Sequence, residues 1–392
     1  MIIDWTGFFG DRNFLSRNWH RQQRAQCDVY EHCTVAANAA GGNHSASQLE
    51  SAAALVFHYR DMQLDRLPAV RGAHQRYVFF LMESPSNSMM IVNNKKSPKQ
   101  QSLDRMLPAD YFNWTMTYRR DSDVPWSYAR FVLRNEDEAS DEKRLNDAQF
   151  ELDTLLAGRT HAVAWFASNC DTHSKRETLV HALSRHMPVH VYGRCGNMSC
   201  KKTSDERACD RVLRERYHFY LSFENSVCRD YATEKLSRAY RNLLVPVVLS
   251  AHVLRALGVP EHSYIAADAF ADVRQLAHHL RHLLANRPAY LAYFAWHRHY
   301  RFVESAFAAA SVATMLPNEG LCQLCRLLLL NNHTDSLSTG HHAQSLRHWW
   351  LHDGRCQKNY ARTLVDRETT THRDSQLRLK PQNNNATAVI LK

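Results

Sequence analysis

The chain has 392 residues, which is too long for one typical domain of about 150 residues, so we expect two packed domains. Its 44% apolar and 22% charged residues exclude collagen-like and wholly disordered chains. The formal net charge of +10 indicates an anionic partner, but composition leaves open whether that partner is nucleic acid, a membrane surface or a nucleotide.

The cysteines and the glycosylation sequons indicate an oxidising compartment. Only one C-x-x-C pair occurs among the ten cysteines, Cys322 with Cys325, whereas a zinc ribbon needs two. Disulfides are therefore favoured; their connectivity is open, with Cys322 to Cys325 as the expected pair. Asn-x-Ser/Thr sequons occur at Asn43, Asn113, Asn197, Asn332 and Asn385. Together these features favour the secretory pathway.

The printed residues carry no obvious membrane or export signal. No stretch reaches the roughly 18 consecutive apolar residues of a membrane span. Charged residues interrupt the first 24 positions, so these do not form the apolar centre of a signal peptide. Either the natural chain begins earlier or the secretory interpretation is wrong.

Short apolar runs that are followed by polar residues predict buried parallel strands. In chain order they cover residues 54–58, 77–82, 161–167, 189–192, 219–223 and 245–249. Helical patterns alternate with them at residues 174–185, 233–241 and 273–284. This alternation predicts an α/β fold. We expect the polar segments 36–47, 134–147 and 367–385 to be loops or mobile tail.

The first segment that could carry chemistry is YVFFLMESP, residues 77–85. A carboxylate at the carboxyl end of such a strand projects into the crevice where α/β sheets bind ligands. Glu83 is therefore a possible general base. The alternative is a solvated residue that merely ends the strand.

The second segment is FNWTMTYRRDSD, residues 112–123, which interleaves aromatic and charged residues. Its Asp121 and Asp123 form a D-x-D triplet, a pattern that can hold a metal under a nucleotide diphosphate. Such a triplet is more often a simple turn.

A strand, a polar turn and a helix with Arg176 in its first turn follow, an arrangement that can bind an anion. An ordinary βαβ unit with a surface arginine is the alternative. Arg194 is a second basic candidate nearby.

The richest segment is YHFYLSFENSVCRDYATEKL, residues 217–236. Its strand leads into Asn225, a loop with Tyr231, and a helix that Thr233 can cap. Lys235 and the positive end of the helix could hold a diphosphate, and Glu234 could accept hydrogen bonds from ribose hydroxyls. A well-capped helix without a ligand is the alternative.

Taken together, these segments resemble the motifs of the α1,3-fucosyltransferases, glycosyltransferase family ten. The runs that carry the resemblance are YVFFLMESP, FNWTMTYRRDSDVPWSY, AVAWFASNC with YGRCG, and FYLSFENSVCRDYATEKL followed by VPVVL. Cys27 and Cys33, together with WWLHDGRC at residues 349–356, are reminiscent of the insect and plant enzymes that fucosylate glycoproteins. The chain departs from the family pattern at Ser250 and Leu254, which puts donor affinity rather than reaction type in doubt.

The resemblance implies a GT-B fold, with two Rossmann-like domains that face each other across a cleft. It implies an acceptor-side domain at residues 1–155, a GDP-fucose-binding domain at 156–310 and a C-terminal extension at 311–392. By motif, Glu83 corresponds to the catalytic base. The donor-site residues carried over in the same way are Arg176, Asn225, Tyr231, Glu234 and Lys235.

The implied reaction is the inverting transfer of L-fucose from GDP-fucose to an N-acetylglucosamine of glycoprotein N-glycans, with the core residue as one expected acceptor. No metal ion or other cofactor is expected to be required, although a divalent cation such as manganese could stimulate the reaction. The D-x-D triplet is then a structural turn. The family also implies the Golgi cisterna membrane, with a lumenal catalytic domain and a membrane anchor that these residues do not contain.

Two other classes of function remain as alternatives. One is a catalytically inactive, glycan-binding relative in the secretory pathway, against which the intact YATEK and MESP segments argue. The other is a nucleic-acid-binding protein, which rests on net charge alone because no nucleic-acid-binding module is recognisable. Nucleic acid is therefore not an expected partner.

Overall fold

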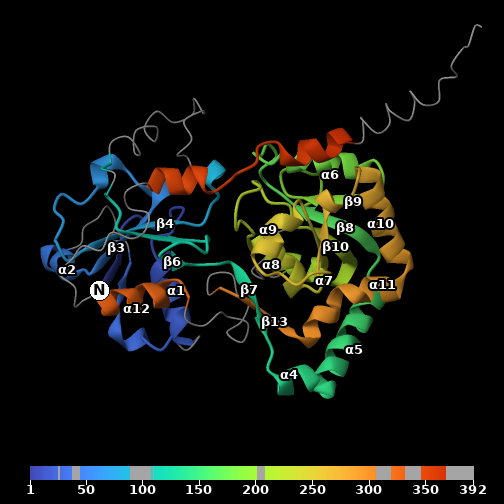
Figure 1. The fold of residues 1–392 in the computed structure, drawn as a ribbon, viewed down its shortest axis with the longest axis horizontal. Helices are drawn as coiled ribbons and strands as arrows, with labels where there is room; N and C mark the ends of the chain where they lie inside the picture. Colours follow the sequence, from blue (N-terminus) through green and yellow to red (C-terminus); the bar gives the residue numbers. More distant parts are fainter. Residues whose placement is uncertain are drawn as a thin grey trace, which may run out of the picture.

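The structure is a computed structural model that describes residues 1–24, 27–37, 45–88, 107–108, 110–200, 208–305, 319–331 and 346–367. Two parallel sheets lie in two halves of the molecule, with a small antiparallel ribbon between them (Figure 1). We call the half with the six-stranded sheet the first lobe and the half with the five-stranded sheet the second lobe. This is the expected α/β fold of GT-B type, with two lobes that face each other.

The six-stranded sheet of the first lobe has the order β2-β1-β3-β4-β5-β6, and all its pairings are parallel. Its strands are β1 Ile2–Asp4, β2 Val35–Ala36, β3 Ala54–His58, β4 Arg76–Leu81, β5 Trp114–Thr117 and β6 Val124–Pro125. Every residue of β3 and β4 is buried, because both faces of the sheet are covered. Just after the carboxyl end of β4, Ser84 makes a hydrogen bond to Ser226, which follows β10 (Tyr217–Leu221) of the second sheet.

The five-stranded sheet of the second lobe has the order β12-β11-β10-β8-β9 and is also entirely parallel. Its strands are β8 His161–Phe166, β9 Val189–Tyr192, β10 Tyr217–Leu221, β11 Val245–Val248 and β12 Ile265–Ala266. Successive side chains of one strand lie in different core clusters, because they point to opposite faces of the sheet: Phe219 of β10 packs in one cluster and Tyr220 in another. Both faces of this sheet are therefore covered by helices.

The helices are consistent with the predicted alternation. The α-helices of the described residues are α1 Phe14–Arg24, α2 Ala46–Ser51, α4 Glu136–Ser140, α5 Glu142–Gly158, α6 Arg176–Ser184, α7 Ala208–Arg216, α8 Glu234–Arg241, α9 Ala251–Ala256, α10 Val273–Ala285, α11 Arg287–Leu291 and α12 Leu321–Asn331. The 3₁₀ helices are η1 Tyr30–His32, η2 Tyr59–Asp61, η3 Leu64–Arg66, η4 Pro85–Asn87, η5 Ala267–Ala269 and η6 Ala292–Arg298, and η9 His348–His352 is a π-helix. Within the described ranges, no helix combines the length and the apolar character needed to cross a bilayer.

The prediction of a loop at residues 134–147 was wrong. The segment contains α4 and the start of α5, and each helix has its own side-chain cap. Asn135 accepts a hydrogen bond from the backbone N–H of Glu138 (2.8 Å), and Asp141 accepts one from that of Arg144 (3.0 Å). Glu, Lys, Arg and Ala favour helices, so the high charge of the segment marked exposed helices rather than a loop. Most of segments 36–47 and 367–385 lies outside the described residues.

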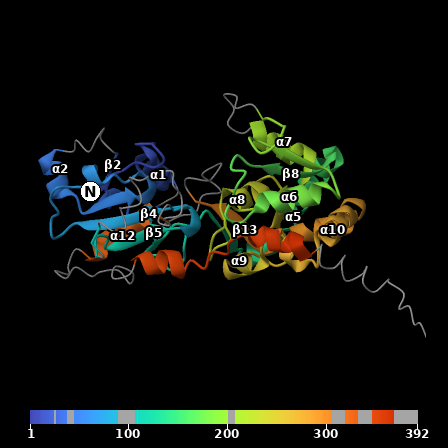
Figure 2. The ribbon, with the colours of Figure 1, turned by 90° about the horizontal axis from the view of Figure 1, so that it is seen from above.

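The chain crosses between the lobes more than once. Strand β7 (Ala129–Leu133) follows the first lobe and pairs antiparallel with β13 (Tyr300–Glu304), which follows the second. Helix α12 then packs against α1 in the first lobe, where Trp349 and Trp350 are also buried (Figures 1 and 2). The last helical turns, residues 360–367, return to the second lobe, where they bury Ala361. The division at 155/156 and 310/311 stays a prediction.

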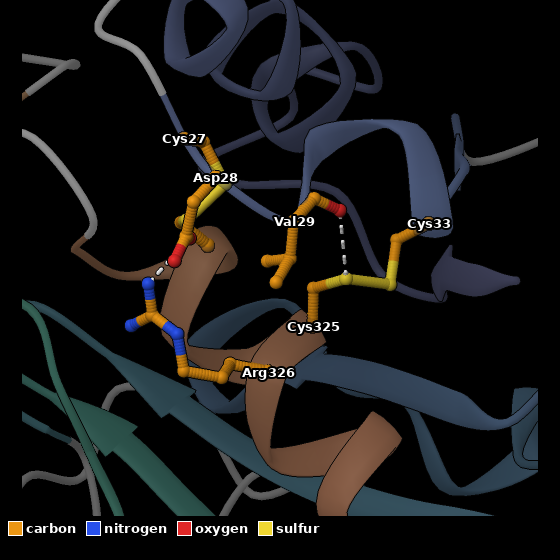
Figure 3. Close-up of a disulfide and its surroundings, with 7 residues drawn as sticks. Cys27, Asp28, Val29, Cys33, Cys325 and Arg326 are labelled. Carbon is orange, nitrogen blue, oxygen red and sulfur yellow. Dashed lines mark hydrogen bonds and ion pairs between the residues drawn. A yellow bond between two sulfur atoms is a disulfide. The ribbon is translucent and has the colours of Figure 1, made fainter.

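The disulfides hold this C-terminal part to the rest of the protein. All ten cysteines are paired, as Cys27–Cys322, Cys33–Cys325, Cys170–Cys195, Cys200–Cys209 and Cys228–Cys356. The expected bond between Cys322 and Cys325 was therefore wrong. Both residues lie on α12 and face different cysteines of the N-terminal segment 27–33. Figure 3 shows Cys325 bonded to Cys33, and Asp28 facing Arg326 beside it.

Candidate active site

Glu83 lies just beyond the carboxyl end of β4, where the two lobes meet. Its Oε2 atom accepts a hydrogen bond from Nδ2 of Asn87 (2.5 Å) in the first lobe. The same oxygen accepts hydrogen bonds from Asn225 Nδ2 and from the Tyr231 hydroxyl of the second lobe, both at 3.4 Å. The structure therefore brings together three of the residues predicted from sequence: Glu83, Asn225 and Tyr231.

Buried contacts hold this junction in place. The hydroxyl of Ser84 donates to that of Ser226 across the lobes (2.8 Å). The ring of Tyr231 packs edge-on against Tyr118, with centroids 4.9 Å apart. Burial, reinforced by the negative charge of Glu83, raises the pKa of Tyr231 well above its usual value. Its hydroxyl therefore stays protonated and donates a hydrogen bond to the Glu83 carboxylate.

A cluster of charges lies at the start of α8, in the same loop. The Glu224 carboxylate accepts hydrogen bonds from the backbone N–H (2.8 Å) and the hydroxyl (2.7 Å) of Thr233, the N-cap residue. The Lys235 ammonium lies 3.0 Å from Oε2 of Glu224 and donates to Oε1 of Glu234 at 2.8 Å. Lys235 is thus the cation of a partly buried triad with two carboxylates.

The charges of this cluster support one another. Burial disfavours ionisation, but Glu224 and Glu234 outweigh it and raise the pKa of Lys235. Burial likewise raises the pKa of Glu224, an effect that Lys235 opposes. Glu224, which pairs with Lys235, was not among the donor-site residues predicted from the sequence. The sequence feature that could have indicated Glu224 is its position just after the buried strand β10.

Arg176 points inward rather than into open solvent. Its side chain is buried, with Nη1 donating to the Phe223 carbonyl (2.6 Å) and Nη2 to the Asn169 carbonyl (3.3 Å). Burial and, more weakly, the positive charge of Arg176 oppose the rise in the pKa of Lys235 that Glu224 and Glu234 cause. Arg194, the rival, is exposed and donates to the Ser168 carbonyl at 3.1 Å. Arg176 thus joins the loops after β8 and β10 that shape the site.

A polar cavity of about 510 Å³ opens beside Glu83. Asn87 and Asn225, the two amides that bond to Glu83, both line it. Lys175 of the second lobe and Lys358 and Asn359 of the C-terminal segment line it too. No local motif marked these last two residues, because only the return of the chain to the second lobe places them there.

A smaller hollow of about 30 Å³ lies beside α8. Tyr231 and Leu236 line it, and so do Ser250 and Leu254, the two positions at which the sequence departs from the family pattern. These departures therefore lie next to the predicted donor residues.

The two D-x-D carboxylates bind protein donors in the structure. Asp121 accepts two hydrogen bonds from the Arg119 guanidinium, at 2.9 and 2.6 Å, and one from the indole N–H of Trp349 (3.2 Å). Asp123 accepts from the backbone N–H (2.7 Å) and the hydroxyl (2.8 Å) of Thr115. The two side chains thus serve different structural contacts.

Two parallel α/β lobes with a polar cavity at their junction agree with the GT-B architecture expected from the sequence. Residues 1–129 match the model of the fucosyltransferase N-terminal region, and residues 156–349 match that of the glycosyltransferase family 10 (fucosyltransferase) C-terminal region. The chain belongs to glycosyltransferase family 10, the fucosyltransferases.

Curated relatives agree with this membership. The chain is 33% identical to alpha-(1,3)-fucosyltransferase C of Drosophila melanogaster over 91% of its own length and 79% of that protein. It is 35% identical to alpha-(1,3)-fucosyltransferase fut-1 of Caenorhabditis elegans over 65% of the chain, but spans only 53% of that relative. Identity to glycoprotein 3-alpha-L-fucosyltransferase A of Drosophila melanogaster is 30%, over 63% of the chain and 44% of the relative.

A crystal structure of an alpha1,3-fucosyltransferase with GDP-fucose aligns with a TM-score of 0.49 and 14% identity. The alignment covers 85% of this chain and 91% of that chain.

Proposed function

We propose that the protein transfers L-fucose from GDP-fucose to the 3-hydroxyl of an N-acetylglucosamine in glycoprotein N-glycans, with inversion at the sugar carbon. Family membership and the names of the relatives support α1,3-fucosyl transfer. The likeness to a glycoprotein 3-alpha-L-fucosyltransferase supports a glycoprotein acceptor, whereas the N-glycan and its core residue rest on the resemblance of the sequence motifs.

The observation that carries this proposal is the position of the Glu83 carboxylate at the junction of the lobes, bonded to Asn225 and Tyr231 and adjoining the polar cavity. In the proposed step the acceptor oxygen forms a bond to C1 of fucose while the bond from C1 to the diphosphate breaks. Glu83 takes the acceptor proton, and GDP leaves with the bonding electron pair. General base catalysis of this kind contributes about 10²- to 10⁴-fold to the rate.

The leaving diphosphate gains negative charge, which the second lobe can stabilise. Lys235 and the N-terminal end of α8 are placed for this role, and Arg176 orders the loops around them. Glu234 is the proposed acceptor for ribose hydroxyls, since its side chain is about half exposed (54%). This arrangement would need no metal ion, and a divalent cation could still stimulate turnover.

The Glu83→Gln variant tests the base. Gln keeps the shape of the side chain but does not accept the proton, so we expect GDP-fucose binding to be retained and transfer to fall by at least about 100-fold. The matched control is Glu136→Gln, an exposed carboxylate in the first turn of α4, which should transfer normally.

Transfer would be measured with labelled GDP-fucose on a panel of N-glycan acceptors, with linkage analysis of the product. Undiminished turnover in Glu83→Gln would refute its role as base. Donor binding without transfer to any acceptor by the unmodified protein would favour the inactive, glycan-binding alternative. We also propose that the protein works in the Golgi lumen, consistent with its five disulfides.

A further inference from the structure

Two histidines and one aspartate gather on the surface of the first lobe, on a turn that packs against η4. They are His348 and His352, one turn apart on η9, and Asp353, which follows directly. Their side chains are 62%, 74% and 42% exposed. One nitrogen of each histidine and one oxygen of the carboxylate all lie within 4.8 Å of one another.

The spacing of these atoms matches a zinc coordination shell. Zinc bonds to histidine nitrogen and carboxylate oxygen at about 2.0–2.2 Å, so neighbouring ligand atoms of a tetrahedron lie about 3.4 Å apart. Asp353 Oδ1 is 3.3 Å from His352 Nδ1 and 3.9 Å from His348 Nε2. The two imidazole rings are stacked, with centroids 4.5 Å apart and planes 22° apart, so at least one ring must turn to point its nitrogen lone pair at a shared ion.

The backbone that carries these ligands is anchored from beneath. Between the two histidines, Trp349 and Trp350 are buried in the core of the first lobe. The carbonyl of Trp349 accepts a hydrogen bond from Arg119 (2.5 Å), and the guanidinium of Arg119 lies 4.3 Å from the centre of the Trp349 ring. A rigid scaffold reduces the entropy lost when an ion orders the side chains. The π-helical turn is itself a conformation found often at functional sites.

We propose that His348, His352 and Asp353 form a surface site for a divalent transition-metal ion of the zinc type, with water in the remaining position. Two imidazoles and one carboxylate suit zinc, nickel, cobalt or copper, whereas magnesium and calcium prefer oxygen ligands. The site differs from that of the proposed transfer reaction, because it uses none of the residues assigned to the reaction, although η9 packs against η4, which carries Asn87.

The location of the site gives it a consequence for stability. The Trp349 indole donates to Asp121, which also lies 3.1 Å from Arg229 of the second lobe. The backbone N–H of Arg229 in turn donates to the Gly354 carbonyl, one residue beyond Asp353 (2.8 Å). An ion on η9 would therefore brace the segment that links the lobes and raise the Tm as its concentration rises.

The test uses the full chain, freed of metal by a chelator and titrated calorimetrically with zinc. We expect binding of one ion per chain, weakened at least tenfold by His352→Ala and by Asp353→Asn. The matched control replaces His282, which forms another exposed one-turn pair with His278 on α10 but has no third ligand group close to both among the residues that the structure describes. His282→Ala should bind zinc like the unmodified chain, and a large excess of magnesium should not displace the ion.

Unweakened zinc binding in the His348→Ala/His352→Ala double variant would overturn the proposal, and so would its loss in His282→Ala. A Tm measured in chelator shows whether each variant is folded. If the histidine variants fail to fold, Asp353→Asn and a zinc-soaked crystal decide the question. An anomalous peak between His348 Nε2 and His352 Nδ1 supports the site, and a peak elsewhere or none refutes it.

Discussion

Replacing Lys235 with methionine tests two roles of this residue, the stabilisation of the loop by ion pairs and the binding of the donor diphosphate. The ammonium pairs with Glu224 and Glu234 within the protein, and it is also the proposed partner of the donor diphosphate. Methionine keeps much of the length of the side chain but removes the charge. Stability and donor binding should therefore both fall, for different reasons.

The stability loss follows from the burial of the pair. The side chains of Lys235 and Glu224 are only 16% and 10% exposed, and breaking a buried pair costs about 3–5 kcal/mol because one charge remains unpaired. We expect about 3 kcal/mol, the lower end, since Thr233 still donates two hydrogen bonds to Glu224. The loss of a charged hydrogen bond to a phosphate is worth about 1.5–3 kcal/mol, which weakens GDP binding about 10- to 100-fold.

The Glu224→Gln/Lys235→Met double variant provides the control. Removing the stranded carboxylate charge should restore most of the stability, while GDP binding stays weak. Urea unfolding measures the first quantity and calorimetric titration with GDP the second. If the double variant recovers GDP affinity together with stability, Lys235 only organises the loop and does not contact the phosphates.

Two further predictions concern the base and the cross-links. Tyr231→Phe removes the hydroxyl that donates a hydrogen bond to Glu83, so the rate of transfer should fall a few-fold. The dissociation constant of GDP should stay unchanged. If GDP affinity falls by the same factor, the hydroxyl contacts the nucleotide instead. Replacing Cys33 and Cys325 together by serine should lower the free energy of unfolding by only about 2–3 kcal/mol. The remaining Cys27–Cys322 bridge keeps the long loop closed, so the Cys33–Cys325 bridge by itself closes only a further ring of about nine residues. Peptide mapping without reduction should recover the Cys33–Cys325 bond, and recovery of a Cys322–Cys325 bond would contradict the structure.

The sequence by itself determined the local elements and the family. Residues 54–58 and 189–192 were predicted as strands and are β3 and β9. Both are short, mainly apolar runs; β3 is fully buried, whereas β9 is mostly half-buried. The motif FENSVCRDYATEK was specific enough to indicate a fucosyltransferase. At residues 134–147 the high charge led to the wrong prediction of a loop, since an exposed helix and a loop can have equally polar compositions.

Only the tertiary structure decided which distant residues meet. Cys325 bonds to Cys33, 292 residues away, rather than to Cys322, its neighbour on α12. Tyr231 and Glu83 meet across 148 residues, and Lys358 reaches the cavity only because the chain returns to the second lobe. Local patterns report whether a segment is buried and in which conformation. Long-range partners depend on how two lobes and a crossing C-terminal segment pack, which no single segment encodes.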